Sequence, residues 1–539
     1  MFLALKVASH SVAGQRPVDY ANPLVGTAPL DDPELIGNAP PPGEEIYTGF
    51  TSPGPAWPHG EVNLSPINKD LEHAAGNHGI IFPYTYPRRT IVGFSSVMPG
   101  LTIMPLVGDW TVPPDRGYAS VYDKNSEQAS PGYYTVYFPD HKIKVELTTT
   151  ERTGFYRFTF PKTESGVVLL DLGPADSSIE IIGDHTIRGQ GQRGGRGGRG
   201  GRCFVAEFSR PFKTCGTFRQ NPPALNGGRV RRDDVTTPDS RTESGSYAGC
   251  YLNFSTGAGE QVLIKVASGR DFEEAQQRLE SENSGWNFDG VKKQVESAWN
   301  DKLSRIEIQG GTEKERRLFY STLYHSLSTP RLVTKKGRQF RGNDGQVHTA
   351  EYDRYSPVAF WDTGRNQIVL LTLLEPEVKL DVLRSEFDMA RESGWMNTSF
   401  HGNHAVMMYL GDWERGLNFE YASVYEYLRK NAMDPRGPRR NLAEYLQKGW
   451  IHDMVVAHPS PPYAGGNAGG TRLWNTVGTI TRSRFSPKSS ARRTTIKCFL
   501  PARTITPTFS TPPLASCAGA TKMVRGFHRS IRLSLTTIS

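Results

Sequence analysis

Three loops of this 539-residue chain combine aromatic side chains with polar groups of the kinds that bind sugars. They are YTGFTSPGPAWPHGEVNLSP (47–66), FWDTGRNQ (360–367) and ESGWMNTSFHGNHAVMMYLGDWERG (392–416). The C–H face of a sugar ring stacks on tryptophan, and its hydroxyls form directional hydrogen bonds with Asp, Asn, His and Arg side chains. The loops therefore predict a carbohydrate or polyol site, against the alternative that they are only structural loops.

The glycine-rich run GQGQRGGRGGRGGRC (189–203) contains the pattern GxGxxG at Gly189, Gly191 and Gly194. A dinucleotide site needs a strand before these glycines and a helix after them, and this run cannot open a helix. The three RGG repeats also resemble a tract that binds RNA through flexible arginines. Strand-like segments on both sides, SSIEIIG and CFVAEFS, favour a flexible loop that joins two strands of a hairpin.

The segment HGNH can place His401 and His404 on one face of a helix, a spacing that some metal sites use. No third or fourth ligand accompanies them at a recognisable spacing, so the preferred interpretation is a polar lining of the sugar site. His73 and His78 lie in a glycine-rich loop and are expected at the surface.

No nucleophile with its base is recognisable, because the chain has no GxSxG segment and no cysteine in a protease signature. The carboxylate pairs Glu386/Asp388 and Asp412/Glu414 lie on segments with helical periodicity. Charges on such helices usually belong to the solvated face, so these four carboxylates are expected to be exposed.

Hydrophobic periodicity predicts the elements that position these loops. Between about residues 85 and 285 the period is two, as in KIKVELTTT (142–150) and FYRFTF (155–160), which is typical of half-buried strands. Breaks rich in Gly, Pro and Asp occur at short intervals and indicate an antiparallel sandwich.

After about residue 286 the period becomes helical. TEKERRLFYSTLYHSL (312–327) begins with the capping-box residues Thr312 and Glu315. A second helix is predicted from Pro376 to just before Gly394, and a third around 421–428. Strands followed by helices predict a multidomain α+β fold with an antiparallel β-sandwich over 19–285 and a helical domain over 286–470.

The net charge of +8 comes from the end of the chain. Residues 471–539 hold 12 Lys or Arg, 22 Ser or Thr and no Asp or Glu, so residues 1–470 carry 51 basic against 55 acidic residues. This slightly acidic body gives no support for a nucleic-acid partner. The basic tail is predicted to be disordered, and the lack of acidic residues from 454 onward suggests translation out of frame.

No apolar run reaches 18 residues, so no membrane span is expected. Residues 1–18 are interpreted as a leader or truncated signal peptide with a weak pattern. None of the five cysteines forms a CxxC pair. Cys203, Cys215 and Cys250 fit either one disulfide in an exported protein or three buried thiols, and the sequence leaves both open.

Together with DYANPLVGT (19–27), the three loops in this order resemble glycoside hydrolase family 92, the calcium-dependent exo-acting α-mannosidases. The first loop resembles the family's sandwich loop, FWDTGRNQIVLLTLLEPE its Trp-Asp-Thr-x-Arg segment, and GNHAVMMYLGDWERGL its next barrel helix. The resemblance covers about residues 19–470. It implies a β-sandwich docked on an (α/α)6 barrel, and hydrolysis of terminal α-linked mannose with inversion by two carboxylates and a bound Ca²⁺.

The resemblance gives a substrate-binding role to seven residues and a catalytic role to none. They are Trp57, His59, Trp361, Asp362, Arg365, Asn403 and His404. Trp57 would line the sugar subsite, Asp362 and Arg365 would hydrogen-bond the terminal sugar, and the last two would lie on the barrel rim. Many members carry Asp at the position of Asn403. The family's acid, base and calcium ligands lie in the C-terminal half of its barrel and have no counterpart after residue 470, so the metal ligands stay unassigned.

The sequence thus predicts a truncated or frameshifted family member with an incomplete barrel, an unstructured tail and no catalytic activity. The expected partners are mannose-containing glycans or glycoproteins, and the expected location is secreted or periplasmic. The alternatives are a non-catalytic carbohydrate-binding protein and an RGG-type RNA-associated protein. Linkage specificity and oligomeric state are not predicted.

Overall fold

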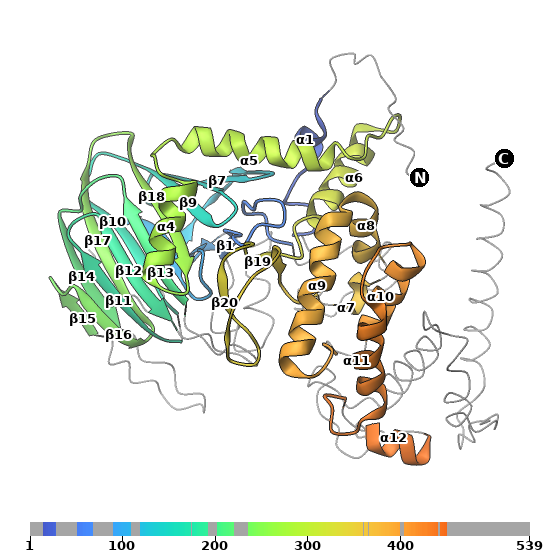
Figure 1. Cartoon of the computed structure of the whole chain (residues 1–539). Helices are drawn as coiled ribbons and strands as arrows, with labels where there is room; N and C mark the ends of the chain where they lie inside the picture. Colours follow the sequence, from blue (N-terminus) through green and yellow to red (C-terminus); the bar gives the residue numbers. More distant parts are fainter. Residues whose placement is uncertain are drawn as a thin grey trace, which may run out of the picture. The chain divides into compact units, whose positions relative to one another are not determined.

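The structure is a computed structural model (Figure 1). It describes residues 15–27, 51–67, 90–108, 119–173, 175–191, 202–219, 235–358, 360–364, 366–398, 404–439 and 442–449. The leader up to residue 14, most of the RGG run and the tail 471–539 lie outside these ranges, as do the five predicted residues His73, His78, Arg365, His401 and Asn403. The side chains of Trp361 and Asp362 are also outside the description.

Two antiparallel sheets form the first part of the described chain (Figure 1). One sheet has the order β1 (Pro66–Ile67), β3 (Gly93–Ser95), β4 (Thr102–Val107), β10 (Thr163–Asp171), β17 (Ala248–Thr256), β14 (Thr214–Arg219), β15 (Val235–Pro238). The other has the order β16 (Thr242–Ser246), β11 (Asp176–Ile182), β12 (Thr186–Gly191), β13 (Arg202–Phe208), β18 (Glu260–Gly269), β9 (Thr153–Phe160), β8 (Ile143–Thr149), β7 (Tyr133–Phe138), β6 (Asp123–Ser130). A short pair, β2 (Thr90–Ile91) and β5 (Ser120–Val121), stands beside them.

The alternation read from the sequence sets which face of each strand is buried. Val145 on β8 lies opposite Phe158 on β9, and both side chains are fully buried in a core cluster drawn from both sheets. Phe155 points to the other face of β9 and is buried as well, since it packs against Phe288 of a covering helix. The strands are therefore buried on both faces where helices cover the sheet.

The glycine-rich run lies between the two predicted strands β11 and β13, but its first residues belong to a further strand, β12, which the sequence did not predict. Gly189 and Gly191 belong to β12, which pairs antiparallel with the next strand, β13. The dinucleotide interpretation is not supported, because the next described element after β12 is the strand β13 and not a helix. The three cysteines of this part of the chain, Cys203, Cys215 and Cys250, are free and buried.

The second part of the chain is mainly helical (Figure 1). Its helices are α5 (Phe288–Leu303), α6 (Glu313–Ser326), α7 (Phe360–Thr363), α8 (Gln367–Leu374), α9 (Pro376–Ser393), α10 (Ala405–Glu414), α11 (Tyr421–Met433) and α12 (Leu442–Lys448). Between α6 and α7 lie two short strand pairs, β19 (Leu332–Thr334) with β22 (Arg354–Tyr355), and β20 (Gln339–Arg341) with β21 (Val347–Thr349). An N-terminal turn of helix, α1 (Pro17–Tyr20), contacts α5 and α6.

The predicted helix signals are confirmed at both ends. The Thr312 hydroxyl accepts from the Glu315 amide and the Glu315 carboxylate accepts from the Thr312 amide, so α6 starts with a capping box. Helix α9 starts at Pro376 and ends before Gly394, which has a left-handed φ of 79°. Helix α4 (Phe272–Glu282) begins earlier than the sequence predicts, and Asp271 caps its N-terminus. It packs on β13 and β18, and we call the two sheets together with α4 the β unit.

The fold class predicted from the sequence is confirmed: a two-sheet β domain is followed by a helical domain. Within the described ranges the helices do not close into a barrel. A search of the same ranges finds no helix that is long and apolar enough to cross a membrane.

Candidate functional site

The first predicted site loop, residues 51–67, is held against the helical part of the chain. Trp57 is partly buried and packs against the helical core cluster. The indole N–H of Trp299, on α5, donates to the Ala56 carbonyl at 2.6 Å. A Cβ on Gly60 would stand 2.7 Å from the Trp57 Cβ and 3.0 Å from the Glu151 carbonyl, so only glycine permits this tight turn.

His59 fastens the tip of this loop. Its amide donates to the Leu327 carbonyl at 3.3 Å, and its own carbonyl accepts from the Leu332 amide at 2.8 Å. The backbone of His59 has a φ of 54°, which is an uncommon conformation for a residue with a side chain. These two backbone bonds across a long sequence separation hold it there.

The His59 ring is buried and is aimed at a carboxylate. Its Nδ1 lies 3.0 Å from the Pro330 carbonyl, and its Nε2 lies 3.3 Å from Oε2 of Glu375. Glu375 precedes α9 and also pairs with Lys302 at 2.7 Å and with Arg305 at 3.4 Å. Burial acts to raise the pKa of Glu375, but the contacts with His59 and Lys302 outweigh it and hold the pKa at about 2.

The second predicted loop is anchored to the same backbone segment as His59. Gln367, at the start of α8, donates through Nε2 to the Ser326 and Thr329 carbonyls at 2.8 and 2.9 Å. Residues 326–332 therefore carry both loops. Within the second loop, Phe360 is buried in the helical core, and the backbone of Trp361 and Asp362 forms the single turn α7.

The third predicted loop is fixed by an asparagine. The Asn431 side chain accepts from the Met396 amide at 3.2 Å and donates to the Met396 carbonyl at 2.7 Å. His404 occupies the N-cap position of α10 and is partly buried. The structure thus places Trp57, His59 and His404, while the other four predicted residues are described as backbone only or not at all.

The expectation that Glu386 and Asp412 are solvated is wrong, because at most 1% of the surface of either residue is exposed. Asp412 forms an ion pair with Lys379 at 2.9 Å and accepts from the Thr372 hydroxyl at 2.7 Å. The sequence shows the charges but not that α8, α9 and α10 pack around them. Burial lowers the pKa of Lys379 to about 8, against the opposing effect of Asp412.

Among the described residues, Glu386 has no cation as its direct partner. It accepts from the Val358 amide at 2.5 Å and from the Asn397 side-chain amide at 3.4 Å. Burial raises its pKa to about 7, against the lowering effects of these two donors and of the Lys379 charge.

Sequence reasoning missed Glu375, Lys379 and Glu386. A signal was present for two of them, because Lys379 and Glu386 are seven residues apart and fall on the same helical stripe as the apolar positions 382, 383 and 390. A polar residue inside an apolar stripe indicates a buried polar contact. Glu375 stands outside a helix and offers no such periodic signal.

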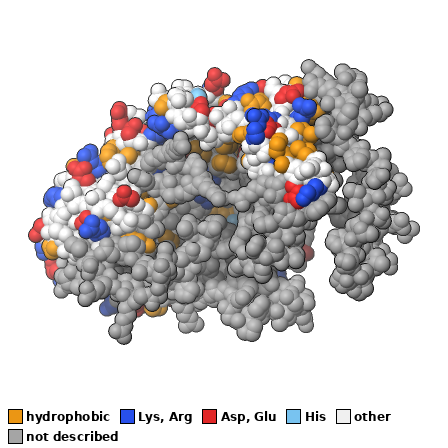
Figure 2. Space-filling model, turned by 90° about the horizontal axis from the view of Figure 1, so that it is seen from below, with side chains coloured by type: hydrophobic (Ala, Val, Ile, Leu, Met, Phe, Trp, Pro, Cys, Tyr) orange, Lys and Arg blue, Asp and Glu red, His pale blue; other side chains and the backbone are white. Residues whose placement is uncertain are grey.

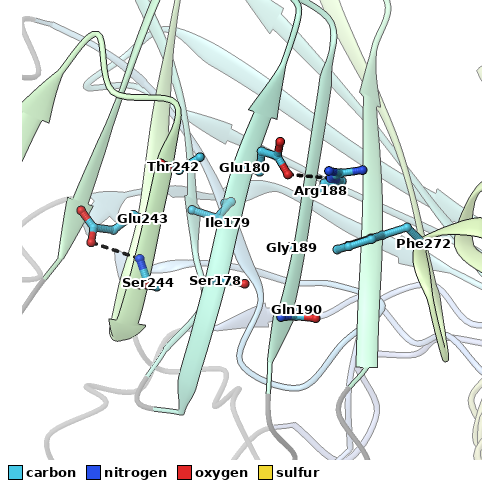
Figure 3. A pocket seen from close by; sticks show the side chains of 10 residues that line it. All are labelled: Ser178, Ile179, Glu180, Arg188, Gly189, Gln190, Thr242, Glu243, Ser244 and Phe272. Carbon is cyan, nitrogen blue, oxygen red and sulfur yellow. Dashed lines mark hydrogen bonds and ion pairs between the residues drawn. The ribbon is translucent and has the colours of Figure 1, made fainter.

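A surface groove of about 370 Å³ lies elsewhere, on the nine-stranded sheet (Figure 3). It is lined by Ser178, Ile179, Glu180, Arg188, Gly189, Gln190, Thr242, Glu243, Ser244 and Phe272. Glu180 and Arg188 pair with each other at 2.7 Å, and the Arg188 guanidinium lies 4.9 Å from the Phe272 ring centroid. None of the three predicted loops lines this groove, so it is separate from the candidate site.

The described ranges do not fit a calcium site. They contain no group of three or more His, Cys, Asp or Glu side chains arranged to hold a metal ion. Calcium takes six to eight oxygen ligands, so a partial set would not suffice. The calcium expectation stays a prediction, and no chemical step is derived through the ion.

The described chain is a β-sandwich joined to a helical domain, with aromatic and polar loops anchored at the junction. Residues 20–268 match the family model described as the glycosyl hydrolase family 92 N-terminal domain. Residues 274–465 match the one described as the glycosyl hydrolase family 92 catalytic domain. The chain belongs to glycoside hydrolase family 92.

Known relatives share the fold at low identity. A family 92 α-mannosidase from Bacteroides thetaiotaomicron superposes with a TM-score of 0.73 at 24% identity, covering 90% of this chain and 65% of its own. A family 92 inverting mannosidase from the same organism gives a TM-score of 0.71 at 24% identity with the same coverage.

A curated relative is named as an uncharacterized secreted glycosidase of Arthroderma benhamiae. It is 26% identical over an alignment of 239 residues, and the match covers 40% of this chain and 30% of the relative. The chain therefore spans less than two thirds of the length of each of these three relatives.

Proposed function

We propose that this protein is a mannosidase-type glycosidase of family 92 whose three loops bind the terminal α-linked mannose of a glycan. The observation that carries the proposal is the shared anchor: residues 326–332 hold both the Trp57–His59 turn and the start of α8, directly after the Trp-Asp-Thr-x-Arg segment. A sugar held between these loops meets an aromatic face from one and hydrogen-bonding groups from the other.

The proposed roles follow the chemistry of the side chains. Trp57 stacks on the sugar, Asp362 accepts from its hydroxyls, and Arg365 donates to them. Trp361 supports this pair. Asn403 and His404 contact the substrate from the rim. For His59 we propose a place next to the sugar as the residue that fixes the loop, because its two ring nitrogens face Pro330 and Glu375.

Hydrolysis with inversion needs two carboxylates about 6.5–9.5 Å apart, one to protonate the leaving oxygen and one to take a proton from the attacking water. We propose no residue for either role. Residues 454–539 contain no Asp or Glu, and Glu375 and Glu386, the carboxylates that contact the loops, are engaged in buried contacts. The 539-residue polypeptide by itself is therefore proposed to bind α-mannosides without hydrolysing them.

We also propose calcium dependence and secretion, which family membership and the secreted relative support. The described residues offer no ligand set for calcium, so the experiment below is carried out both with calcium and without it.

The test uses the purified 539-residue polypeptide, with calcium and with a chelator. Calorimetric titration with methyl α-mannoside and α-linked mannobioses should show saturable binding, and a reducing-sugar assay should show no release above background. Trp57→Phe should weaken binding several-fold through its smaller aromatic face, whereas Trp286→Phe, at an exposed tryptophan of the β unit, should not. Turnover above background would overturn the proposed lack of catalysis. Absence of binding to every α-mannoside would overturn the proposed sugar specificity.

A further inference from the structure

We propose that Glu386 is a positioning residue that couples the second and third site loops from inside the helical domain. The inference rests on the proposed function only for what the loops bind. The coupling itself rests on the contacts of Glu386.

One carboxyl group reaches both loops. The Val358 amide, two residues before α7, donates to Oε1 at 2.5 Å. The Asn397 side-chain amide, within the third loop, donates to Oε2 at 3.4 Å. The two oxygens of one side chain therefore serve two segments that are about forty residues apart in sequence.

The surroundings of Glu386 make an ordinary role in core packing a poor explanation. The side chain is completely buried on α9 beside Val382, Leu383 and Ala390, where an apolar residue would pack without desolvating a carboxyl group. A nearby cation does not account for it either, because Lys379 on the same helix is paired with Asp412 of α10 at 2.9 Å. The remaining polar group that faces it from α10 is Tyr409, which donates to the Leu383 carbonyl.

A buried carboxyl group in this position gives the loops something that an apolar side chain does not. Each loop loses conformational freedom when its donor is bound, and both donors are bound to one rigid helical position. Displacement of one loop changes the position of the carboxyl group that the other loop uses. The α7 turn on one side and residues 396–398 on the other therefore keep their spacing through Glu386.

The test compares Glu386→Gln, which retains a hydrogen-bonding side chain of the same shape, with Glu386→Leu, which fills the volume without hydrogen bonds. Glu146→Leu is the matched control, since Glu146 is a buried carboxylate of the β unit that accepts from Tyr133 and Arg157. Hydrogen–deuterium exchange is measured on peptides covering 354–363 and 394–398, and methyl α-mannoside affinity is measured in parallel.

Glu386→Leu should raise the exchange rate at least tenfold in each of the two peptides and weaken mannoside binding at least tenfold. For Glu386→Gln, both the exchange rates and the mannoside affinity should stay within about threefold of those of the natural chain. Glu146→Leu should leave both peptides protected. Unchanged exchange in both peptides, or an equal rise throughout the chain, would overturn the coupling. Equal mannoside affinity in spite of loosened loops would overturn its relevance to the site.

Asn397→Ala keeps the inference testable when Glu386→Leu does not fold. It removes one of the two contacts, so exchange should rise most in peptide 394–398 and, through the displaced carboxyl group, to a smaller extent in peptide 354–363. A rise in neither peptide, or in peptide 394–398 alone, would count against the coupling. Loosened loops combined with no mannoside binding by the natural chain would leave the coupling standing and reject the proposed function instead.

Discussion

Glu375 and Glu386 are buried carboxylates only eleven residues apart, yet their surroundings shift their pKa values in opposite directions. Glu375 faces His59, Lys302 and Arg305, and its pKa is about 2. Glu386 faces two neutral amides, and its pKa is about 7. Burial penalises the charge in both cases, and the presence or absence of a close cation decides the direction of the shift.

Glu375→Gln should destabilise the protein by about 3 kcal/mol at pH 7, because it leaves the cations Lys302 and Arg305 beside a buried site without their carboxylate. The pKa of Glu375 is lowered, so its contribution is fully present above about pH 4.5 and is lost as the pH falls toward 2. Urea unfolding at pH 7 and at pH 3 should show the difference shrinking at the lower pH.

Glu313→Gln is the exposed control, since the Glu313–Arg317 pair lies on the surface of α6. It should cost less than about 0.5 kcal/mol. Equal losses for the two variants at pH 7 would contradict the assigned role of Glu375.

Glu386→Gln should change the pH dependence of stability in the opposite sense. The pKa of Glu386 is raised, so the folded chain holds a proton between about pH 4.5 and 7 that the unfolded chain has lost. The natural chain therefore loses stability as the pH rises through this window, and the variant does not. Relative to the natural chain, the variant should gain about 1–3 kcal/mol between pH 5 and pH 8.

Urea unfolding of both chains at pH 5, 6, 7 and 8 measures this gain. Among the described residues, the charged and titratable groups that act on Glu386 are Lys379 and Tyr409, which both chains share. A stability difference that stays constant from pH 5 to pH 8 would rule the prediction out.

At the scale of single elements, α9 carries much of the site. It begins after Glu375, buries Lys379 and Glu386 on its inner face, and ends before Gly394, within the third loop. Its ends and its apolar stripe were predicted from Pro376, Gly394 and the spacing of leucines. The identity of its buried polar side chains was not, because periodicity shows where a stripe lies and not which charges its neighbours accommodate.

Gly394→Ala should destabilise the protein by about 1–2 kcal/mol, since a side chain at a φ of 79° meets the steric penalty of the left-handed region. Gly285→Ala is the matched control, because a Cβ there meets no atom within 4 Å and its φ is not positive. Thermal unfolding should show a clear fall in Tm for the first variant and almost none for the second. A comparable fall for both would show that the left-handed cap does not matter.

At the scale of the whole described chain, the junction between the β unit and the helices is built from contacts between distant residues. Trp299 reaches Ala56 across 243 positions, and His59 reaches Pro330 across 271. The described surface in Figure 2 differs from this junction, because charged side chains are exposed on it and Lys and Arg lie among Asp and Glu. The junction is thus specified by a few buried polar contacts.

Trp299→Phe should cost about 1–3 kcal/mol, because it leaves the Ala56 carbonyl without its donor in a buried position. Hydrogen exchange of the 51–67 loop should rise with it. Trp286→Phe, at a tryptophan that is 38% exposed, should change neither quantity appreciably. Full protection of the loop in Trp299→Phe would show that the indole hydrogen bond does not fix the loop.

The sequence by itself determined the order of strands and helices, the ends of α6 and α9 and the family, because periodicity, caps and loop motifs are local properties of the chain. It also drew attention to the three loops. Only the tertiary structure decided that His59 points into a buried ionic cluster, that Glu386 and Asp412 are inside, and that residues 326–332 carry two of the loops. Those outcomes depend on which distant segments pack around each side chain. Burial, and not residue type, decides whether a carboxyl group is a solvated charge or a buried group that hydrogen-bonds two loops.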